Sequence, residues 1–208
     1  MVQKLESRPR GRPKAYDPAL ALEHATALFW RQGVAATTLD DLCLATGMNK
    51  PSLYAAWGDK RQWYAQALQA YVGRVGQGMA QALSQPSLAK ALDALLQQAV
   101  SLYEGGRGCF MVSTAPVAAM DDADIRRVLQ RALAAQDALL VARLQQAQAD
   151  GEVAPNADVP GLAAMVAALL HTLALRARAG ATPLELTQMG RSGGATLLQV
   201  ARLGLDRG

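Results

Sequence analysis

The chain has 208 residues, of which 51% are hydrophobic, 18% are charged and ten are aromatic. This length buries a core without disulfides or metal ions, which excludes a mini-scaffold, and the abundance of alanine and leucine argues against disorder and for helices. The formal net charge is +4, and residues 1–14 hold five basic side chains against one glutamate. We therefore expect a globular, mainly α-helical protein whose basic N-terminal segment favours a polyanionic partner.

Residues 1–14 are expected to form a disordered basic arm. The run Arg10-Gly11-Arg12-Pro13-Lys14 is similar to the core of an AT-hook, in which arginines enter the narrow minor groove of A·T-rich DNA. The alternative is a solvated tail that binds phosphates without sequence preference. Under both interpretations the candidate DNA contacts are Arg10, Arg12 and Lys14.

Two short helices are predicted after the arm. The first begins at Pro18, because Asp17 is a favourable N-cap and proline is tolerated in the first turn, and it ends at Gly33. The second begins after Thr38, which forms a pattern similar to a capping box together with Asp41, three residues later. Each start is thus marked by a capping side chain.

A third helix is predicted from the N-cap Asn49 to Trp57, after a turn at Gly47. The second and third helices have the length and spacing of a helix-turn-helix, whose second helix enters the major groove of DNA. A short αα-hairpin has the same spacing, so the pattern alone leaves both open. Leu53 and Trp57, four residues apart, are expected to bury one face of the third helix.

A characteristic series of residues occurs between residues 11 and about 66: Ala25, Leu28, Phe29, Gly33, Thr37, Thr38, Leu42, Gly47 and the run Asn49-Lys50-Pro51-Ser52-Leu53-Tyr54-Ala55-Ala56-Trp57-Gly58-Asp59-Lys60. The series resembles the N-terminal domain of the TetR family of one-component transcriptional regulators. Trp57 stands where phenylalanine is usual in the most similar branch. Lys50 stands where arginine is frequent, which exchanges a bidentate fork for a point charge, so no guanine contact is assigned to it.

The resemblance implies an all-α subunit with a helix-turn-helix DNA-binding domain at residues 15–61 and a larger ligand-binding and dimerisation domain at residues 62–208. It also implies a homodimer that binds a palindromic double-stranded DNA operator, as a repressor released by a small-molecule effector. Carried over by position, it implies that four residues of the third helix face DNA, namely Lys50, Pro51, Ser52 and Tyr54. For Tyr54 the alternative is a core aromatic.

Two phosphate contacts are also implied, by Thr38 and Lys60. Both stand where a helix begins, and free amide groups at a helix N-terminus favour anions. The chemistry of helix termini and the resemblance therefore agree on these two positions.

After residue 59 the pattern changes to longer helices, expected at residues 60–83, 88–104, 110–119 (with a bend at Pro116), 123–150, 159–179 and 183–205. The apolar stretch 162–175 is shorter than the ~20 residues that cross a bilayer, so a buried helix is expected and no membrane partner. The N-terminus lacks the apolar region of a signal peptide, and the two cysteines are far apart in sequence. We expect a cytoplasmic protein without metal or cofactor.

An effector pocket is expected between the middle helices of residues 62–208. Its candidate lining is mostly apolar, which favours a small hydrophobic or aromatic effector over an anion. Ordinary core packing is the alternative for each residue. The candidates are Tyr71, Met79, Tyr103, Cys109, Phe110, Met111, Met120, Met165 and His171.

Cys109 has two interpretations. It lies among glycines and beside Arg107, whose charge is expected to lower the pKa of the thiol, as in a redox or electrophile sensor. The alternative is a small buried residue after a turn. Cys43 is expected in the core.

Two groups of glycines lie inside predicted helices, where glycine costs about 0.5–1 kcal/mol relative to alanine. Gly190, Gly193 and Gly194 are expected to allow close helix contact in a four-helix dimer interface. Gly73, Gly76 and Gly78 either let the helix at residues 60–83 bend when effector binds, or admit a neighbouring helix.

An enzyme and an architectural DNA-binding protein are the alternatives to a regulator. An enzyme needs acid, base or nucleophilic groups that converge, and the two histidines lie far apart without a metal or phosphate-loop motif. An architectural DNA-binding protein does not need so large a second domain. A regulator is therefore expected, not an enzyme.

Overall fold

The computed structural model describes residues 16–203, and the regular structure in this range is entirely helical. The arm, with the candidate contacts Arg10, Arg12 and Lys14, lies outside the described residues. The all-α class is thereby confirmed. The elements are α1 (Pro18–Ala36), α2 (Leu39–Thr46), α3 (Lys50–Trp57), α4 (Lys60–Leu83), α5 (Leu88–Leu102), a 3-10 turn (Glu104–Gly106), α6 (Phe110–Ser113), α7 (Ala115–Met120), α8 (Ala123–Ala149), α9 (Val159–Arg178) and α10 (Pro183–Leu203).

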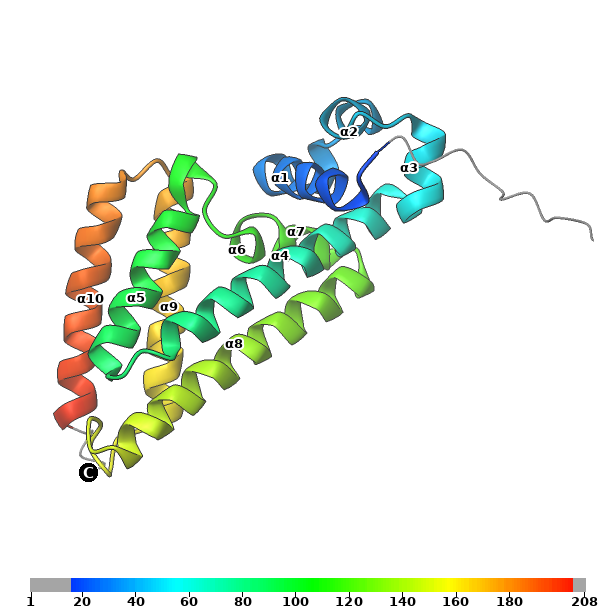
Figure 1. The fold of residues 1–208 in the computed structure, drawn as a ribbon. Coiled ribbons are helices and arrows are strands. Elements are labelled where there is room, and N and C mark those ends of the chain that lie inside the picture. The colour runs from blue at the N-terminus through cyan, green and yellow to red at the C-terminus, as the bar shows by residue number, and fades with distance from the viewer. Residues whose placement is uncertain (1–15, 204–208) are drawn as a thin grey trace, which may run out of the picture.

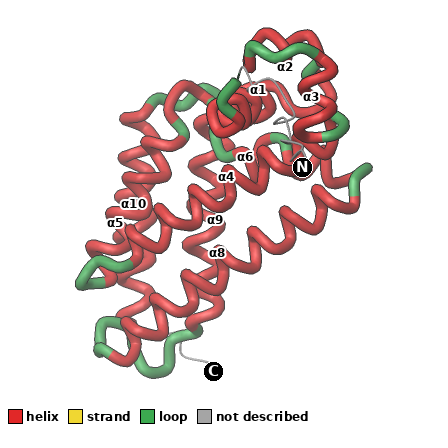
Figure 2. Tube along the Cα trace, turned by 45° about the vertical axis from the view of Figure 1, so that its right-hand side comes forward, coloured by secondary structure: helices red, strands yellow, loops and turns green. Residues whose placement is uncertain are grey.

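The helices form two parts, which we call the head (α1–α3) and the body (α4–α10). Figure 1 shows the head at one end of the molecule, with α4 starting beside α3 and running away from it through the body. Helix α8 lies along α4, and α5, α9 and α10 pack together at the end far from the head. The turned view in Figure 2 shows the same arrangement, with the head above the long helices.

A buried aromatic cluster joins the head to the body. Phe29 of α1 lies edge-on to Tyr64 of α4, with ring centroids 5.2 Å apart. Phe110 of α6 lies edge-on to Tyr64 at 5.2 Å and to Tyr71 at 5.5 Å, and Tyr71 in turn meets Trp30 of α1 at 4.8 Å. Such edge-to-face pairs stabilise the fold by more than the burial of their surface alone. The head and the first half of α4 therefore form one packed unit.

The helix starts follow the capping residues expected from the sequence. The carboxylate of Asp17 accepts hydrogen bonds from the amides of α1, and Asn49 Oδ1 accepts from Ser52 N at 2.9 Å in α3. Regular helix in α1 breaks at Gly33, whose φ of +76° lies in the left-handed region, and a further turn continues to Ala36. The expected end at Gly33 is therefore the point of a kink.

The single helix expected at residues 110–119 is two helices. The break lies at Thr114 and not at Pro116, because proline occupies the first turn of α7, where no hydrogen-bonding amide is needed. The side chain of Thr114 is buried, and its hydroxyl lies 2.8 Å from Tyr64 Oη. The hydrogen bond to the aromatic cluster fixes this break.

Helix α9 has 20 residues and is, by length and composition, apolar enough to cross a bilayer, although its apolar stretch was expected to be too short. In the structure it packs between α5, α8 and α10, and nine of its side chains are buried. The packing thus shows the buried helix that was expected. A helix in a protein core can be as apolar as one that crosses a membrane.

Candidate nucleic-acid interface and ligand cavity

Helices α2 and α3 are joined by a tight turn at Gly47. Gly47 has a φ of +69° and caps α2 through its amide, which donates to Cys43 O at 2.9 Å. Helix α2 itself starts in a full capping box, since Asp41 N donates to Thr38 Oγ1 and Thr38 N donates to Asp41 Oδ2. These bonds hold the pKa of Asp41 below its usual range. Two short helices are thus fixed at a defined angle.

Helix α3 presents polar side chains on one face and packs with the other. Leu53 is buried, whereas Tyr54 is 51% exposed, so the core alternative for Tyr54 has no support. The ring of Trp57 stacks on the ring of Trp63, with the ring centroids 4.7 Å apart and the ring planes 4° from parallel. Tryptophan therefore replaces phenylalanine here by stacking on a residue of α4.

The exposed part of α3 holds the four residues expected to face DNA. Lys50 and Pro51 are exposed, and Ser52 is half-buried. Lys50 Nζ lies 2.7 Å from Asp40 Oδ1 of α2, and this carboxylate raises the pKa of the ammonium. Both side chains are largely exposed, so the pair is weak and Lys50 can leave it at little cost.

Lys60 lies where α4 begins, close to the start of α2. Its ammonium donates a hydrogen bond to Thr37 O at 2.8 Å. This bond links the start of α4 to the head, next to Thr38. In the structure Lys60 is thus oriented by a backbone carbonyl, which the sequence reasoning did not anticipate. Asp59 caps α4 in a second capping box with Gln62.

A clamp of hydrogen bonds connects α9 to the kinked end of α1. Arg178 donates to Arg31 O at 2.8 Å, to Trp30 O at 3.4 Å and to Arg107 O at 3.5 Å. The break at Gly33 leaves carbonyls of α1 without their helical donors, and Arg178 supplies donors in their place. Arg107 stacks on Trp30, with its guanidinium carbon 4.7 Å from the ring centroid. Sequence reasoning missed this clamp.

A cavity of about 120 Å³ lies inside the body, between α4, α5, α8, α9 and the segment before α6. Among the expected lining residues, Met79, Tyr103, Cys109, Met111 and His171 contribute to it. The remaining lining residues are Arg74, Val75, Leu95, Gln98, Ala99, Leu102, Gln136 and Leu170. None of these eight residues was predicted, because the five apolar ones are common core residues and the three polar ones resemble surface residues.

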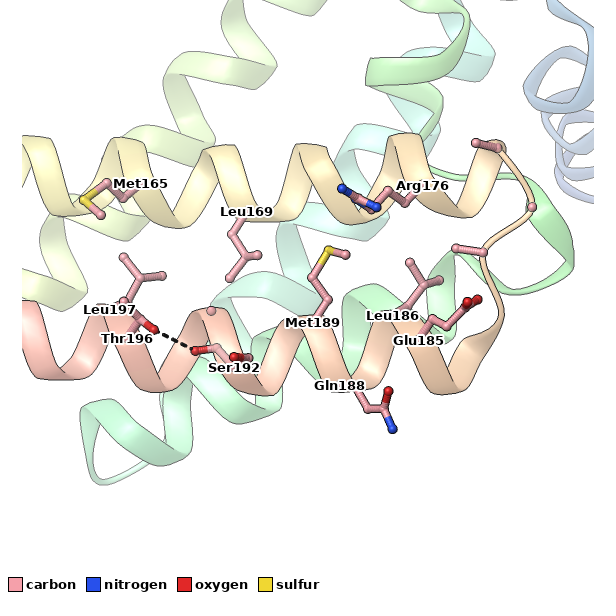
Figure 3. Close-up of a pocket in the computed structure, with 14 residues that line it drawn as sticks. Met165, Leu169, Arg176, Glu185, Leu186, Gln188, Met189, Ser192, Thr196 and Leu197 are labelled. Atoms are coloured by element: carbon pink, nitrogen blue, oxygen red, sulfur yellow. Dashed lines mark hydrogen bonds between the residues drawn. The ribbon is translucent and has the colours of Figure 1, made fainter.

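Four of the expected lining residues do not line this cavity. Tyr71 and Phe110 are fully buried in the aromatic cluster. Met120 is 74% exposed at the end of α7, and Met165 is 45% exposed on α9. In Figure 3, Met165 lies on the side of α9 that borders α10, in a separate groove.

The Cys109 thiol has the opposite character from a reactive cysteine. Burial raises its pKa, although hydrogen bonds from Tyr71 Oη, at 3.3 Å, and from the amides of Met111 and Val112 oppose the shift. Arg107 faces Trp30, so it does not lower the pKa of the thiol as expected. Cys43 is half-buried, which is more exposed than expected for a core residue.

Helices α9 and α10 form the open groove of about 930 Å³ drawn in Figure 3. The glycines of α10 face neighbours in their own chain. A Cβ at Gly193 would lie 2.8 Å from Leu169 Cδ2, and one at Gly194 would lie 2.9 Å from Leu96 Cδ1. The close approach that these glycines permit is therefore made to α9 and α5, which corrects the expectation that it is made to a second subunit.

Gly73 and Gly76 lie in open surroundings on α4. A Cβ at either position would meet no other atom within 4 Å, apart from its own helix. The alternative that these glycines admit a neighbouring helix is therefore wrong for both. Gly78 differs, since a Cβ there would lie 1.9 Å from Gln98 Nε2.

Comparisons with known proteins agree with this geometry. Residues 21–67 match the family "Bacterial regulatory proteins, tetR family", and residues 87–192 match "Tetracyclin repressor-like, C-terminal domain". The chain is similar to the HTH-type transcriptional repressor ComR of Escherichia coli (strain K12), with 33% identity over 187 residues that cover 88% of this chain and 89% of ComR. It is also 34% identical to the repressor BdcR of the same organism over 110 residues, which are 52% of this chain and 56% of BdcR.

A solved structure extends the likeness to the fold. A cysteine mutant of the TetR family regulator CifR, in complex with 26-base-pair operator DNA, superposes with a TM-score of 0.80 at 28% identity. The superposition covers 89% of this chain and 98% of that one. The matches to head and body together show that this chain belongs to the TetR family of helix-turn-helix transcriptional regulators and is not an enzyme.

Proposed function

We propose that this chain is a transcriptional repressor that binds a palindromic operator as a homodimer and is released by a small, mostly apolar effector. The observation that carries the proposal is the exposed face of α3, with Lys50 and Tyr54 pointing out of a head whose opposite face is buried. Repression is supported by the similarity to ComR and BdcR, and operator binding by the likeness to CifR on DNA. The protein would act in the cytoplasm.

The division of labour follows the two parts of the fold. Residues 15–61 would read DNA, and residues 62–208 would bind effector and dimerise, while the arm adds phosphate or minor-groove contacts. Thr38 and Lys60 would approach phosphates at the starts of α2 and α4, where the free amides of both helices favour anions.

Dimerisation through α9 and α10 is supported by apolar side chains that the single chain leaves uncovered. Met165 and Leu175 on α9 and Leu184 on α10 are exposed, and Met165 lines the open groove of Figure 3. Two copies related by a two-fold axis would cover these side chains in a four-helix interface. Their two α3 helices would then reach successive major grooves, about 34 Å or somewhat more apart.

Coupling between effector and DNA would act through α4. The open surroundings of Gly73 and Gly76 support a bend in this helix, which runs from the head to the cavity. Effector would thus select a state whose two heads no longer fit the operator. A redox sensor acting through Cys109 has less support, because the thiol is buried and its pKa is raised.

The experiment is an operator selection from random double-stranded DNA with the full chain, followed by titrations on the selected palindrome. Lys50→Ala and Tyr54→Ala should each weaken operator binding about tenfold or more, because each removes one contact of the reading helix. Lys90→Ala, at an exposed position of α5, is the matched control and should bind as the parent does. Parental affinity in both α3 variants would refute the assignment of α3.

A further inference from the structure

The cavity in the body has two ends of different chemistry. The inner part is formed by side chains that are buried and apolar, chiefly Met79, Leu95, Ala99, Met111 and Leu170. The mouth is formed by polar side chains that are exposed or half-buried, namely Arg74, Gln98, Gln136 and His171. A ligand that fills the cavity therefore combines an apolar body with one polar end.

Arg74 gives this mouth its charge. Among the residues that the structure describes, no aspartate or glutamate lines the cavity, and no ion pair or side-chain hydrogen bond involves Arg74. Burial lowers the pKa of His171, so its ring is neutral at neutral pH, although Asp137, outside the lining, acts in the opposite direction. Arg74 is thus the one charged side chain among the described residues that line the cavity.

The amides beside Arg74 add hydrogen-bond donors. Gly78 lies one helical turn after Arg74 on the same face of α4, and a Cβ there would lie 1.9 Å from Gln98 Nε2. Because Gly78 has no side chain, the amide of Gln98 can pack against α4 at the mouth of the cavity. Gln136 Nε2 lies 3.4 Å from His171 Nε2, and because an amide nitrogen only donates, the imidazole accepts this bond. Donors therefore outnumber acceptors at this end.

The volume limits the size of the apolar part. The cavity holds about 120 Å³, somewhat less than the roughly 150 Å³ of an engineered cavity that binds benzene. A single ring or a short alkyl chain fits this space, while a fused ring system does not.

We propose that this cavity binds a small monocarboxylic acid, with the carboxylate on Arg74 and Gln98 at the mouth and a single ring or short alkyl chain in the apolar interior. That such an acid is the effector rests on the proposed function. A guanidinium holds a carboxylate in a charge-assisted hydrogen bond, and the acid is ionised at neutral pH. The proposal keeps the apolar body expected from the sequence but departs from the preference for a hydrophobic or aromatic effector over an anion.

The test is calorimetric titration of the full chain at neutral pH with two matched pairs of probes, benzoate against benzyl alcohol and hexanoate against hexan-1-ol. In at least one pair the acid should bind at least about tenfold more tightly than the alcohol. Equal affinities within both pairs, or no binding by either acid, would overturn the proposal.

Two variants locate the binding. Arg74→Gln should weaken the acid at least about tenfold and leave the alcohol unchanged, whereas Arg131→Gln, at an exposed position of α8 outside the cavity, should change neither. Ala99→Phe should abolish binding of the acid, because the new ring occupies the apolar end. Because Arg74 is exposed, the Arg74→Gln protein is expected to fold. Unchanged affinity of this variant for the acid would refute the assignment of Arg74.

Operator binding is measured in parallel, with and without the acid that binds. Operator binding by the free protein together with no acid binding overturns this inference and leaves the proposed function standing. Failure to bind any operator overturns the proposed function, and the calorimetry still decides the ligand class. Acid binding without release of DNA would remove its role as effector.

Discussion

The head and the body place their candidate binding residues in different settings. In the head, Lys50 and Tyr54 are exposed, and the hydrophobic contacts that support them lie on the other side of α3. In the body, the cavity lies within the core itself, and Met79, Tyr103, Cys109 and Met111 are buried. Substitutions in the head can therefore separate binding from folding, whereas most substitutions around the cavity change both.

The largest effect is expected at Phe110 of the aromatic cluster, because its ring packs against Tyr64 and Tyr71, the two residues of α4 that contact the rings of α1. Phe110→Ala should lower the free energy of unfolding by about 3–5 kcal/mol, because it leaves a hole between Tyr64 and Tyr71. Urea denaturation measures the loss. Val117→Ala, at an exposed position of α7, is the control and should change stability by less than about 0.5 kcal/mol. A similar small change in Phe110→Ala would show that head and body do not share this core.

A smaller effect is expected at the clamp between α9 and α1. Arg178→Ala should lower the free energy of unfolding by about 1–2 kcal/mol, because the carbonyls of Trp30 and Arg31 lose their donors. It should also reduce the factor by which effector weakens operator binding, measured in paired DNA titrations. Arg131→Ala is the control for removing an exposed arginine. An unaltered factor would show that the clamp has no part in coupling.

Still smaller effects are expected at the glycines of α4. Gly76→Ala should raise the free energy of unfolding by about 0.5–1 kcal/mol, since nothing lies within 4 Å of the new methyl group. If α4 bends on release, the same variant should keep its operator affinity and respond less to effector. Gly47→Ala is the contrasting control and should be destabilised, because its φ is +69°. A stabilised Gly76→Ala protein with normal release would end the bending proposal.

The last prediction compares the two thiols and involves no change in stability. Cys43 of the head is half-buried, while Cys109 of the body is buried with a raised pKa, so a thiol reagent should modify Cys43 first. Mass spectrometry of the native protein after timed labelling gives the order. Faster modification of Cys109 would return the electrophile-sensing alternative to consideration.

Local signals were enough for the helix starts in the head. Asp17, Thr38 and Asn49 mark helix starts through bonds within three residues of themselves, so the sequence pattern predicts them and the structure shows each bond. The break at Thr114 was not predictable in this way, because it depends on Tyr64, fifty residues away in sequence.

The cavity was only half predictable for the same reason. Residue type picked out Met79, Tyr103 and Met111, but it did not separate Leu95 or Leu170 from ordinary core residues. Arg74 and Gln98 resemble ordinary surface residues until α4 and α5 pack together. Met120 was assigned to the lining by residue type, and its position at the exposed end of α7 removes it. Packing between helices therefore decides which side chains meet a ligand.

The kink at Gly33 and its clamp have a consequence for the energetics of regulation. The loss of about 1–2 kcal/mol expected for removing the Arg178 side chain lies within the roughly 1–3 kcal/mol that typically couples two binding sites. Under the proposed function, an effector that breaks these bonds would need few contacts to shift the head. Thermodynamic reciprocity would then require that operator DNA weaken effector binding by the same factor, so that proposed dimers free in solution would fill with effector at lower concentrations than those on the operator.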